Sequence, residues 1–307
     1  MSYIVKGCEW MNGKRKNLSL NIVMAVCIVA LVLCVCQIVY SVAEYKKAED
    51  KRKELEDLMS AIGSTSATET LTATVTDLTE TTEATEPDVT DATTTETVEV
   101  TEPVPVPREQ YRAIYEQIST LKAQYPDLFG WIYIEFDEKH IINLPVMQGD
   151  DNSFYIHHAY DGSESKAGSI TVDYRNTDYR IDLNQNIILY GHHMNDGSMF
   201  ANVASKYKSQ ENFNSVPVVF YSTEGVYTFN VFAVYNAKDG DDYDTIGFGG
   251  DRLKQFCLEK QRKSFYTKNL TFDEQNTIIT LVTCTNFGSE GRVIVHGVLD
   301  GYDSFFD

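Results

Sequence analysis

Residues 277–284 read Thr-Ile-Ile-Thr-Leu-Val-Thr-Cys, and residues 292–298 read Arg-Val-Ile-Val-His-Gly-Val. β-Branched residues dominate both runs, which is typical of strands. The loop at 286–291 that joins them is short, so the two strands are predicted to pair in antiparallel fashion. In that arrangement Cys284, at the end of the first strand, lies beside Arg292, at the start of the second.

Strand patterns also dominate the chain upstream of this pair. An amphipathic helix is predicted first, at 108–125, where apolar residues recur at helical spacing. Helical insertions are expected at 198–207 and 251–264. The eight predicted strands are 130–135, 144–148, 169–174, 186–192, 217–221, 227–235, 277–285 and 292–299. Residues 107–307, about 200 in number, therefore form one domain. Its expected fold class is mainly β, a closed eight-stranded barrel with peripheral helices.

Three residue types suited to acyl transfer stand at or near predicted strand ends. Cys284 offers a thiol, although a free cysteine is more often buried and inert. The Arg292 guanidinium beside it would favour a thiolate and could stabilise a carbonyl oxyanion. Leu189-Tyr190-Gly191-His192-His193 brings imidazoles to another strand end. Side chains alternate along a strand, so at most one of the two histidines faces Cys284. Together these residues describe a nucleophile, a proton carrier and an oxyanion donor.

Several of these stretches resemble the sortases, specifically class B. They are the run from Thr280 to Cys284 together with Arg292, the run Tyr-Gly-His-His-Met-Asn-Asp-Gly-Ser-Met-Phe at 190–200, and the upstream runs Gly-Trp-Ile at 130–132, Leu-Pro-Val-Met-Gln at 144–148 and Asp-Asn-Ser-Phe-Tyr at 151–155. The resemblance covers the domain from about residue 107 to 300. The long insertion at 242–272 is similar to the one, containing a helix, that class B carries between its sixth and seventh strands. An N-terminal helix before the barrel is also similar to class B.

The resemblance implies a cysteine transpeptidase that attaches secreted proteins to the cell wall of a Gram-positive bacterium. Cys284 would be the nucleophile, His192 the general acid and base, and Arg292 the oxyanion or substrate-positioning group. The implied partners are secreted proteins with a C-terminal sorting signal, in class B often of an NPxTN-like type. The acceptor would be an amine of a peptidoglycan precursor or a pilin lysine. No cofactor is implied. His193, beside the catalytic position, is expected to be a surface or loop residue.

One departure from the family concerns acidic residues near the active cysteine. Thr285 and Asn286 follow Cys284, and the nearest downstream carboxylate is that of Glu290. We therefore assign no carboxylate that would orient His192.

Three other functions stay open at this point. A pilin-polymerising sortase remains in the same family, although class C pilin polymerases usually carry an Asp-Pro-aromatic lid and a C-terminal membrane span, neither of which this chain has. A membrane-anchored β-barrel binding module, in which Cys284 is inert, belongs to a different functional class. A purely hydrolytic cysteine peptidase is the weakest of the three.

The N-terminal part predicts a membrane anchor. Leu20 to Tyr40 is an apolar run long enough to cross a bilayer as one helix. Lys14, Arg15 and Lys16 precede it, which favours a cytoplasmic N-terminus and an extracellular domain. A cleaved signal peptide is the rival interpretation, but its apolar region is usually shorter. We expect a cytoplasmic tail at 1–17, a single-pass signal anchor at 18–43 and a charged helical stalk at 44–60.

Residues 61–106 contain 16 threonines, ten acidic residues and no basic residue. Such a segment lacks the large apolar side chains that offset chain entropy, so a disordered linker is expected. The whole chain has a formal charge of -19. That balance argues against nucleic acid as a partner, because phosphate binding needs clustered Lys and Arg.

The remaining cysteine and histidine patterns are read as structural. Neighbouring histidines at 157–158 and 192–193 diverge along a strand, so no metal site is expected. Cys257 fits the apolar face of a helix and is expected to pack in the core.

Overall fold

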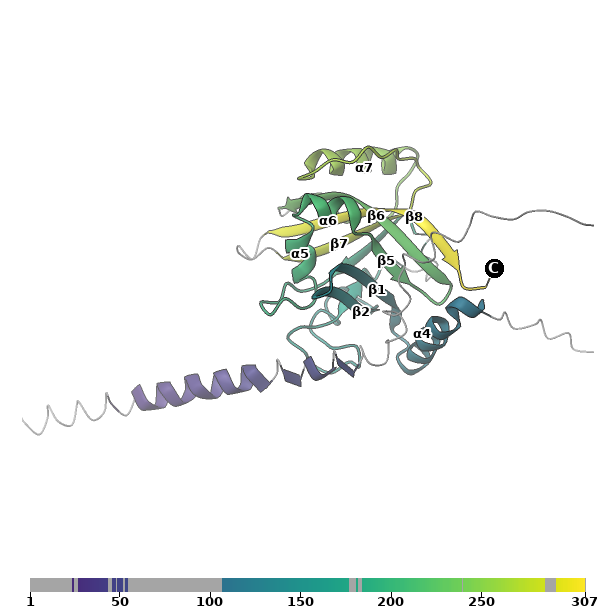
Figure 1. Cartoon of the computed structure of the whole chain (residues 1–307). Coiled ribbons are helices and arrows are strands. Elements are labelled where there is room, and N and C mark those ends of the chain that lie inside the picture. Colours follow the sequence, from purple (N-terminus) through teal and green to yellow (C-terminus); the bar gives the residue numbers. More distant parts are fainter. Residues whose placement is uncertain are drawn as a thin grey trace, which may run out of the picture.

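The computed structural model describes residues 24, 27–43, 46–47, 49–51, 53–54, 107–176, 181, 184–238, 240–284 and 291–306. The expected tail at 1–17 and linker at 61–106 lie outside these residues, as do parts of the expected anchor and stalk. The barrel domain is described apart from short gaps (Figure 1).

Eight strands close into a barrel in the order β1-β2-β3-β4-β7-β8-β6-β5. Their bounds are β1 Leu128–Asp137, β2 His140–Met147, β3 Ile170–Val172, β4 Asn186–Tyr190, β5 Val218–Tyr221, β6 Gly225–Ala237, β7 Ile278–Cys284 and β8 Arg292–Ser304. The pairs β2–β3 and β4–β7 are parallel and the others are antiparallel. The predicted eight-stranded barrel is therefore confirmed.

The strand bounds differ from the predicted ones where turns or loops decide them. β1 and β2 form one long hairpin that is paired from Leu128–Met147 to Asp137–His140, with a register shift near each end. β3 is only three residues long, and β4 ends at Tyr190 rather than at His192. The histidine therefore lies just beyond the strand, where its side chain is not committed to sheet packing.

The two faces of the strands bury different sets of side chains. Alternate residues such as Ile187, Leu189, Leu281 and Val295 point into the barrel and form its core. Their neighbours in sequence point outward, where Ile188, Val282 and Ile294 are buried beneath the connection between β6 and β7. Because these strands are buried on both faces, they read as nearly continuous apolar runs.

Helices cover the barrel at several places. A 3-10 turn, Glu109–Tyr111, leads into α4 (Arg112–Gln124), which buries Ile114, Ile118 and Leu121 as the sequence predicts. The other helices are α5 (Ala201–Lys206), α6 (Gln210–Ser215) and α7 (Arg252–Lys263). Helix α7, expected at 251–264, lies on one side of the barrel, whereas α4 lies near its opposite end (Figure 1).

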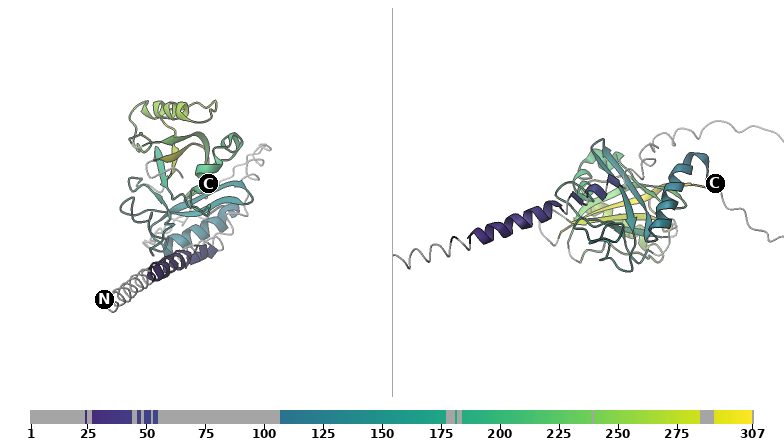
Figure 2. Two further views of the ribbon diagram at one scale, coloured as in Figure 1. Left: turned by 90° about the vertical axis from the view of Figure 1, so that its left-hand side faces the viewer. Right: turned by 90° about the horizontal axis from the view of Figure 1, so that it is seen from below.

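The start of α4 lies against the end of β8, as the view from below shows (Figure 2). The Arg108 guanidinium pairs with the Asp303 carboxylate, and the Tyr111 hydroxyl donates to the same side chain. The Tyr111 and Phe305 rings pack with their centroids 5.5 Å apart. These contacts join the two ends of the described domain.

A further helix runs over residues 27–43 and projects away from the barrel (Figure 1). Within the described residues, which omit 18–23 and 25–26, no helix combines the length and apolar character needed to span a membrane. Beyond this helix, the Lys51 ammonium pairs with the Asp161 carboxylate of the barrel domain.

Candidate active site

Cys284 is the last residue of β7 and is partly exposed. Its partner across the antiparallel β7–β8 pair is Arg292, the first residue of β8. The predicted placement of these two residues side by side is therefore confirmed. The loop between them at 285–290, which includes Glu290, lies outside the described residues.

His192 reaches the same edge of the barrel from the neighbouring strand. β4 and β7 are parallel, Tyr190 pairs with Val282, and the Gly191 amide donates to the Val282 carbonyl over 3.1 Å. His192 and Cys284 each come two residues after that pair, so they are level with one another. Because β4, β7 and β8 are adjacent in the sheet, the backbones of His192, Cys284 and Arg292 stand in a row.

The ring of His192 is half-buried and, among the described residues, has one hydrogen-bond partner. Its Nε2 lies 2.9 Å from the backbone carbonyl oxygen of Ile156. A carbonyl oxygen can only accept, so Nε2 carries the proton and Nδ1 is the basic nitrogen of the neutral ring. Within the described part of the chain, no carboxylate makes a hydrogen bond to this ring. The orienting group is a peptide carbonyl instead.

Electrostatics keep the His192 imidazole neutral. Burial lowers its pKa below the ordinary 6.5, the Ile156 carbonyl opposes that effect, and the nearby His157 lowers the pKa further. The centroids of the His157 and His192 rings are 6.1 Å apart. A neutral imidazole at neutral pH can accept a proton from a thiol.

His193 lies in the loop after β4, as the sequence predicts, but it also makes a contact that the sequence does not predict. It is half-buried, and its Nδ1 donates to the Cys284 carbonyl oxygen over 3.1 Å. The two adjacent histidines do diverge, as alternation requires. His192 turns to the loop that contains Ile156, whereas His193 holds the backbone of Cys284.

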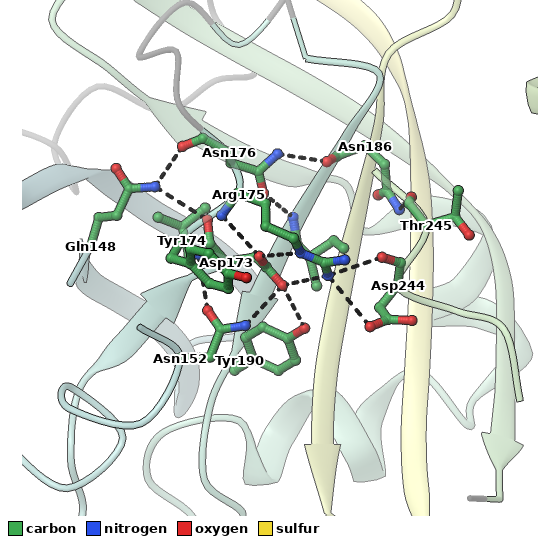
Figure 3. A network of polar contacts seen from close by, with 12 residues as sticks. Gln148, Asn152, Asp173, Tyr174, Arg175, Asn176, Asn186, Tyr190, Asp244 and Thr245 are labelled. Atoms are coloured by element: carbon green, nitrogen blue, oxygen red, sulfur yellow. Dashed lines mark hydrogen bonds and ion pairs between the residues drawn. The ribbon is translucent and has the colours of Figure 1, made fainter. Parts of the chain in front are cut away.

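The residues of a second polar group were not singled out by sequence reasoning. Asp173 and Arg175, just after β3, form an ion pair with the Arg175 Nε 2.8 Å from the Asp173 Oδ1 (Figure 3). The Tyr190 hydroxyl donates to the same carboxylate over 2.9 Å. A signal was present in the sequence, because Asp173-Tyr174-Arg175-Asn176 follows an apolar strand directly.

The other cysteine and histidines have structural places. Cys257 is fully buried in α7, as predicted, and burial raises the pKa of its thiol to about 12. His296 is fully buried on β8. Within the described residues, no three His, Cys, Asp or Glu side chains converge as metal ligands would.

Comparison with known proteins identifies the arrangement. A family model described as the sortase domain matches residues 138–300. Sortase B of Listeria monocytogenes is 34% identical over 190 residues, which span 61% of this chain and 75% of that protein.

Two solved structures resemble the fold as well as the sequence. Sortase B of Clostridium perfringens is 30% identical with a TM-score of 0.54, covering 60% of this chain and 99% of the other. A Staphylococcus aureus sortase B–substrate complex is 30% identical with a TM-score of 0.54, covering 61% of this chain and 85% of the other. The barrel has this topology, the family model matches more than half of the chain, and the relatives named above are sortase B proteins. The chain therefore belongs to the sortase family of cysteine transpeptidases and is a class B sortase.

Proposed function

We propose that this enzyme cleaves a C-terminal sorting signal after its threonine and joins the acyl group to an amine of the cell wall. Cys284 is the nucleophile, His192 the general acid and base, and Arg292 the group that stabilises the oxyanion. The observation that carries the proposal is the row formed by His192 just after β4, Cys284 at the end of β7 and Arg292 at the start of β8. A nucleophile, a proton carrier and a fixed cation beside one another are what acyl transfer requires.

In the first half-reaction, Nδ1 of neutral His192 takes the proton of the Cys284 thiol. The sulfur then forms a bond to the carbonyl carbon of the threonine, and the negative charge on the carbonyl oxygen is held by Arg292. When the C–N bond breaks, the His192 imidazolium gives its proton to the leaving amine. The product is a thioester between the substrate and Cys284.

In the second half-reaction, an acceptor amine attacks the thioester carbonyl. His192 removes the proton that the amine loses, the new amide bond forms, and the Cys284 sulfur leaves with the proton from His192. Water could resolve the same thioester, so the preference for an amine defines a transpeptidase. The Staphylococcus aureus relative was solved as a sortase B–substrate complex, which supports a substrate of the same class for this chain.

The test is to follow the intact mass of the full chain in detergent with NPxTN-like and LPxTG-like peptides. We expect an acyl adduct on Cys284 with the preferred peptide, resolved faster by an added amine than by water. Comparing a peptidoglycan-type amine with a lysine peptide distinguishes wall anchoring from pilin polymerisation. Cys284→Ala and His192→Ala should form no adduct.

The control uses the second cysteine of the domain. Cys257→Ala removes a buried thiol and should leave the adduct on Cys284 unchanged. If no peptide acylates a folded protein whose Cys284 also resists thiol reagents, the binding-module alternative replaces this proposal.

The proposed location is the cell membrane, with a single-pass anchor, a cytoplasmic N-terminus and an extracellular catalytic domain. The apolar run at 20–40 supports it, as do Ile28 and Leu31 on the described helix, which expose 60% and 66% of their surface. The expected result is that the full chain stays in the membrane pellet after alkaline carbonate extraction, whereas a chain lacking residues 1–43 does not. Release of the full chain into the supernatant would contradict the anchor.

A further inference from the structure

Asp173 is a fully buried acid outside the row of proposed catalytic residues. Its carboxylate accepts five hydrogen bonds, three of them from Arg175 through Nε, Nη2 and the backbone amide. The other two come from the Tyr190 hydroxyl over 2.9 Å and the Asn152 side-chain amide over 3.0 Å (Figure 3). Because the donors belong to Arg175, Tyr190 and Asn152, the buried carboxylate joins three separate segments of the chain.

The charge of Asp173 is compensated where it stands. Burial alone raises the pKa of a carboxyl group, but the hydrogen bonds from Arg175 and Tyr190 lower the pKa of Asp173 below its usual value. The carboxylate is therefore ionised and forms a two-pronged pair with Arg175, the geometry in which such pairs are strongest. Only the Asp173 side of the pair is buried, because the Arg175 side chain keeps 38% of its surface exposed. Such a pair is weak evidence for net stability, so its position matters here more than its energy.

Two of the segments joined at Asp173 lead to His192. Tyr190 ends β4 and is two residues before His192. Asn152 lies four residues before Ile156, whose carbonyl oxygen accepts the hydrogen bond from Nε2 of His192. The Asn152 side chain holds this loop in a second way, because its oxygen accepts from the Tyr174 amide over 2.9 Å. The carboxylate thus supports both the backbone that carries the imidazole and the group that orients its ring.

The third segment, which contains Arg175, contacts the connection between β6 and β7. Nη2 of Arg175 donates to the backbone oxygen of Asp244 over 3.1 Å and lies 3.4 Å from its carboxylate. Asp244 belongs to the β6–β7 connection, which covers the outer face of β4, β7 and β8. The neighbouring Thr245 is fixed in the same way, because its backbone oxygen accepts from Asn186 over 2.8 Å (Figure 3).

We propose that Asp173 is a positioning residue of the transpeptidase: through Tyr190 and Asn152 it sets the orientation of His192, and through Arg175 it holds the β6–β7 connection against the barrel. This inference rests on the proposed function for its kinetic consequences, but not for its structural ones. In this enzyme the buried carboxylate does not contact the imidazole directly. It acts through the tyrosine, the asparagine and the loop they hold.

Two variants test the positioning role without adding charge. Tyr190→Phe removes only the hydroxyl that donates to Asp173. The double variant Asp173→Asn/Arg175→Gln removes the ion pair and keeps the net charge of the chain. Tyr266→Phe is the matched control, because its hydroxyl also makes one hydrogen bond, to the Lys208 carbonyl oxygen over 2.6 Å, but has no link to Asp173.

The first measurement is the NMR titration of the histidine Cε1–H signals of the full chain in detergent. The chain has six histidines, and His192→Gln assigns the relevant signal. Because burial is the main cause of the lowered pKa of His192, release of its ring should raise its titration midpoint toward 6.5 in both test variants. Buried His296 reports on folding, because it should stay untitrated above pH 5 while the domain is intact.

The second measurement is the rate of acyl adduct formation. Tyr190→Phe should lower kcat by up to about 100-fold, the cost of misplacing a catalytic group by about 1 Å, with KM unchanged. The double variant should lower kcat further and also raise KM, because the β6–β7 connection loses its tie to Arg175. Tyr266→Phe should change neither value and should leave the His192 midpoint in place.

The proposal is overturned if both test variants are folded, as an untitrated His296 would show, and yet have the wild-type His192 midpoint and the wild-type kcat. Should the double variant fail to fold, Tyr190→Phe alone decides, since it changes no charge and keeps the ring. If the wild-type chain forms no adduct, the proposed function fails, and the His192 titration still decides whether Asp173 positions the ring.

Discussion

At the scale of single residues, the identity of the group that orients His192 has chemical consequences. The Ile156 carbonyl is neutral, so it aligns the ring without the strong stabilisation of an imidazolium that a carboxylate would supply. Burial and His157 disfavour the charged ring as well. Under the proposed mechanism, these properties suit His192 to accept the thiol proton first and to return it quickly to the leaving amine.

This arrangement predicts the acid limb of the pH profile. If acylation needs neutral His192, kcat/KM should stay high below pH 6.5 and fall only as the lowered pKa is crossed. The measurement is the initial rate of adduct formation at low peptide concentration between pH 4.5 and pH 8. A midpoint at or above 6.5 would contradict the neutral, buried imidazole.

A second residue, His296, has a role in stability rather than in chemistry. Its Nδ1 lies 2.8 Å from the Thr280 hydroxyl and its Nε2 lies 3.1 Å from the Tyr235 hydroxyl. Thr280 donates its own proton to Asn186 and therefore accepts from Nδ1, which leaves Nε2 to accept from Tyr235. Burial, assisted by the charge of Lys260, lowers the pKa of His296 to about 3.

His296 should therefore make the domain sensitive to acid. The unfolded chain binds a proton at the ordinary pKa of 6.5, whereas the folded chain binds it only near 3, so stability falls as the pH drops between these values. The expected loss approaches about 1.4 kcal/mol per pH unit in that window. Urea unfolding of wild type and His296→Gln tests this, and parallel dependences of the unfolding free energy on pH would refute it.

At the scale of secondary-structure elements, the end of β4 is packed too closely for any side chain at Gly191. A Cβ there would lie 2.6 Å from the Cδ1 of Ile170 and 2.7 Å from the ring of Phe200. Because glycine has no side chain, the main chain at the end of β4 can lie against the core, which brings His192 level with Cys284. The glycine between Tyr190 and His192 is required by space rather than by backbone conformation.

We expect Gly191→Ala to displace the end of β4. Overpacking of this kind costs about 1–3 kcal/mol of stability, and the shift of His192 should lower kcat roughly 100-fold. Urea unfolding and the acylation rate measure the two effects. Gly249→Ala is the control, because a Cβ at Gly249 meets no atom within 4 Å. Equal behaviour of the two variants would show that β4 tolerates the methyl group.

At the scale of the whole molecule, the two ends of the described domain contact each other. Arg108 and Tyr111, which both precede α4, bind Asp303 near the end of β8. Helix α4 also covers Trp131, which is fully buried and donates its indole N–H to Asn143. The catalytic unit therefore includes α4 and the residues just before it, in addition to the barrel.

The boundary predicted at residue 107 can be tested by limited proteolysis. The sequence predicts a disordered linker at 61–106, a segment outside the described residues, so we expect cleavage there. The resistant fragment should begin between residue 100 and Arg108 and should retain α4. Mass spectrometry of the fragment decides, and a stable product that begins after Gln124 would show that α4 is not part of the folded unit.

The sequence by itself determined the strands and the meeting of Cys284 with Arg292. Both depend on local patterns: β-branched runs define strands, and a short loop between consecutive strands leaves one antiparallel register that pairs their facing ends. His192 could be placed at a strand end for the same reason. The family resemblance then supplied a role for each of these residues.

Only the tertiary structure decided which loops surround them. The Ile156 carbonyl on His192, the His193 ring on the Cys284 carbonyl and the Asp173 cluster all join segments that are distant in the chain. Each consists of polar contacts made when the barrel closes, and such contacts leave no periodic signal in the sequence. Hydrophobic periodicity reports which face of an element is buried, but it does not report which polar group of another segment will meet that face.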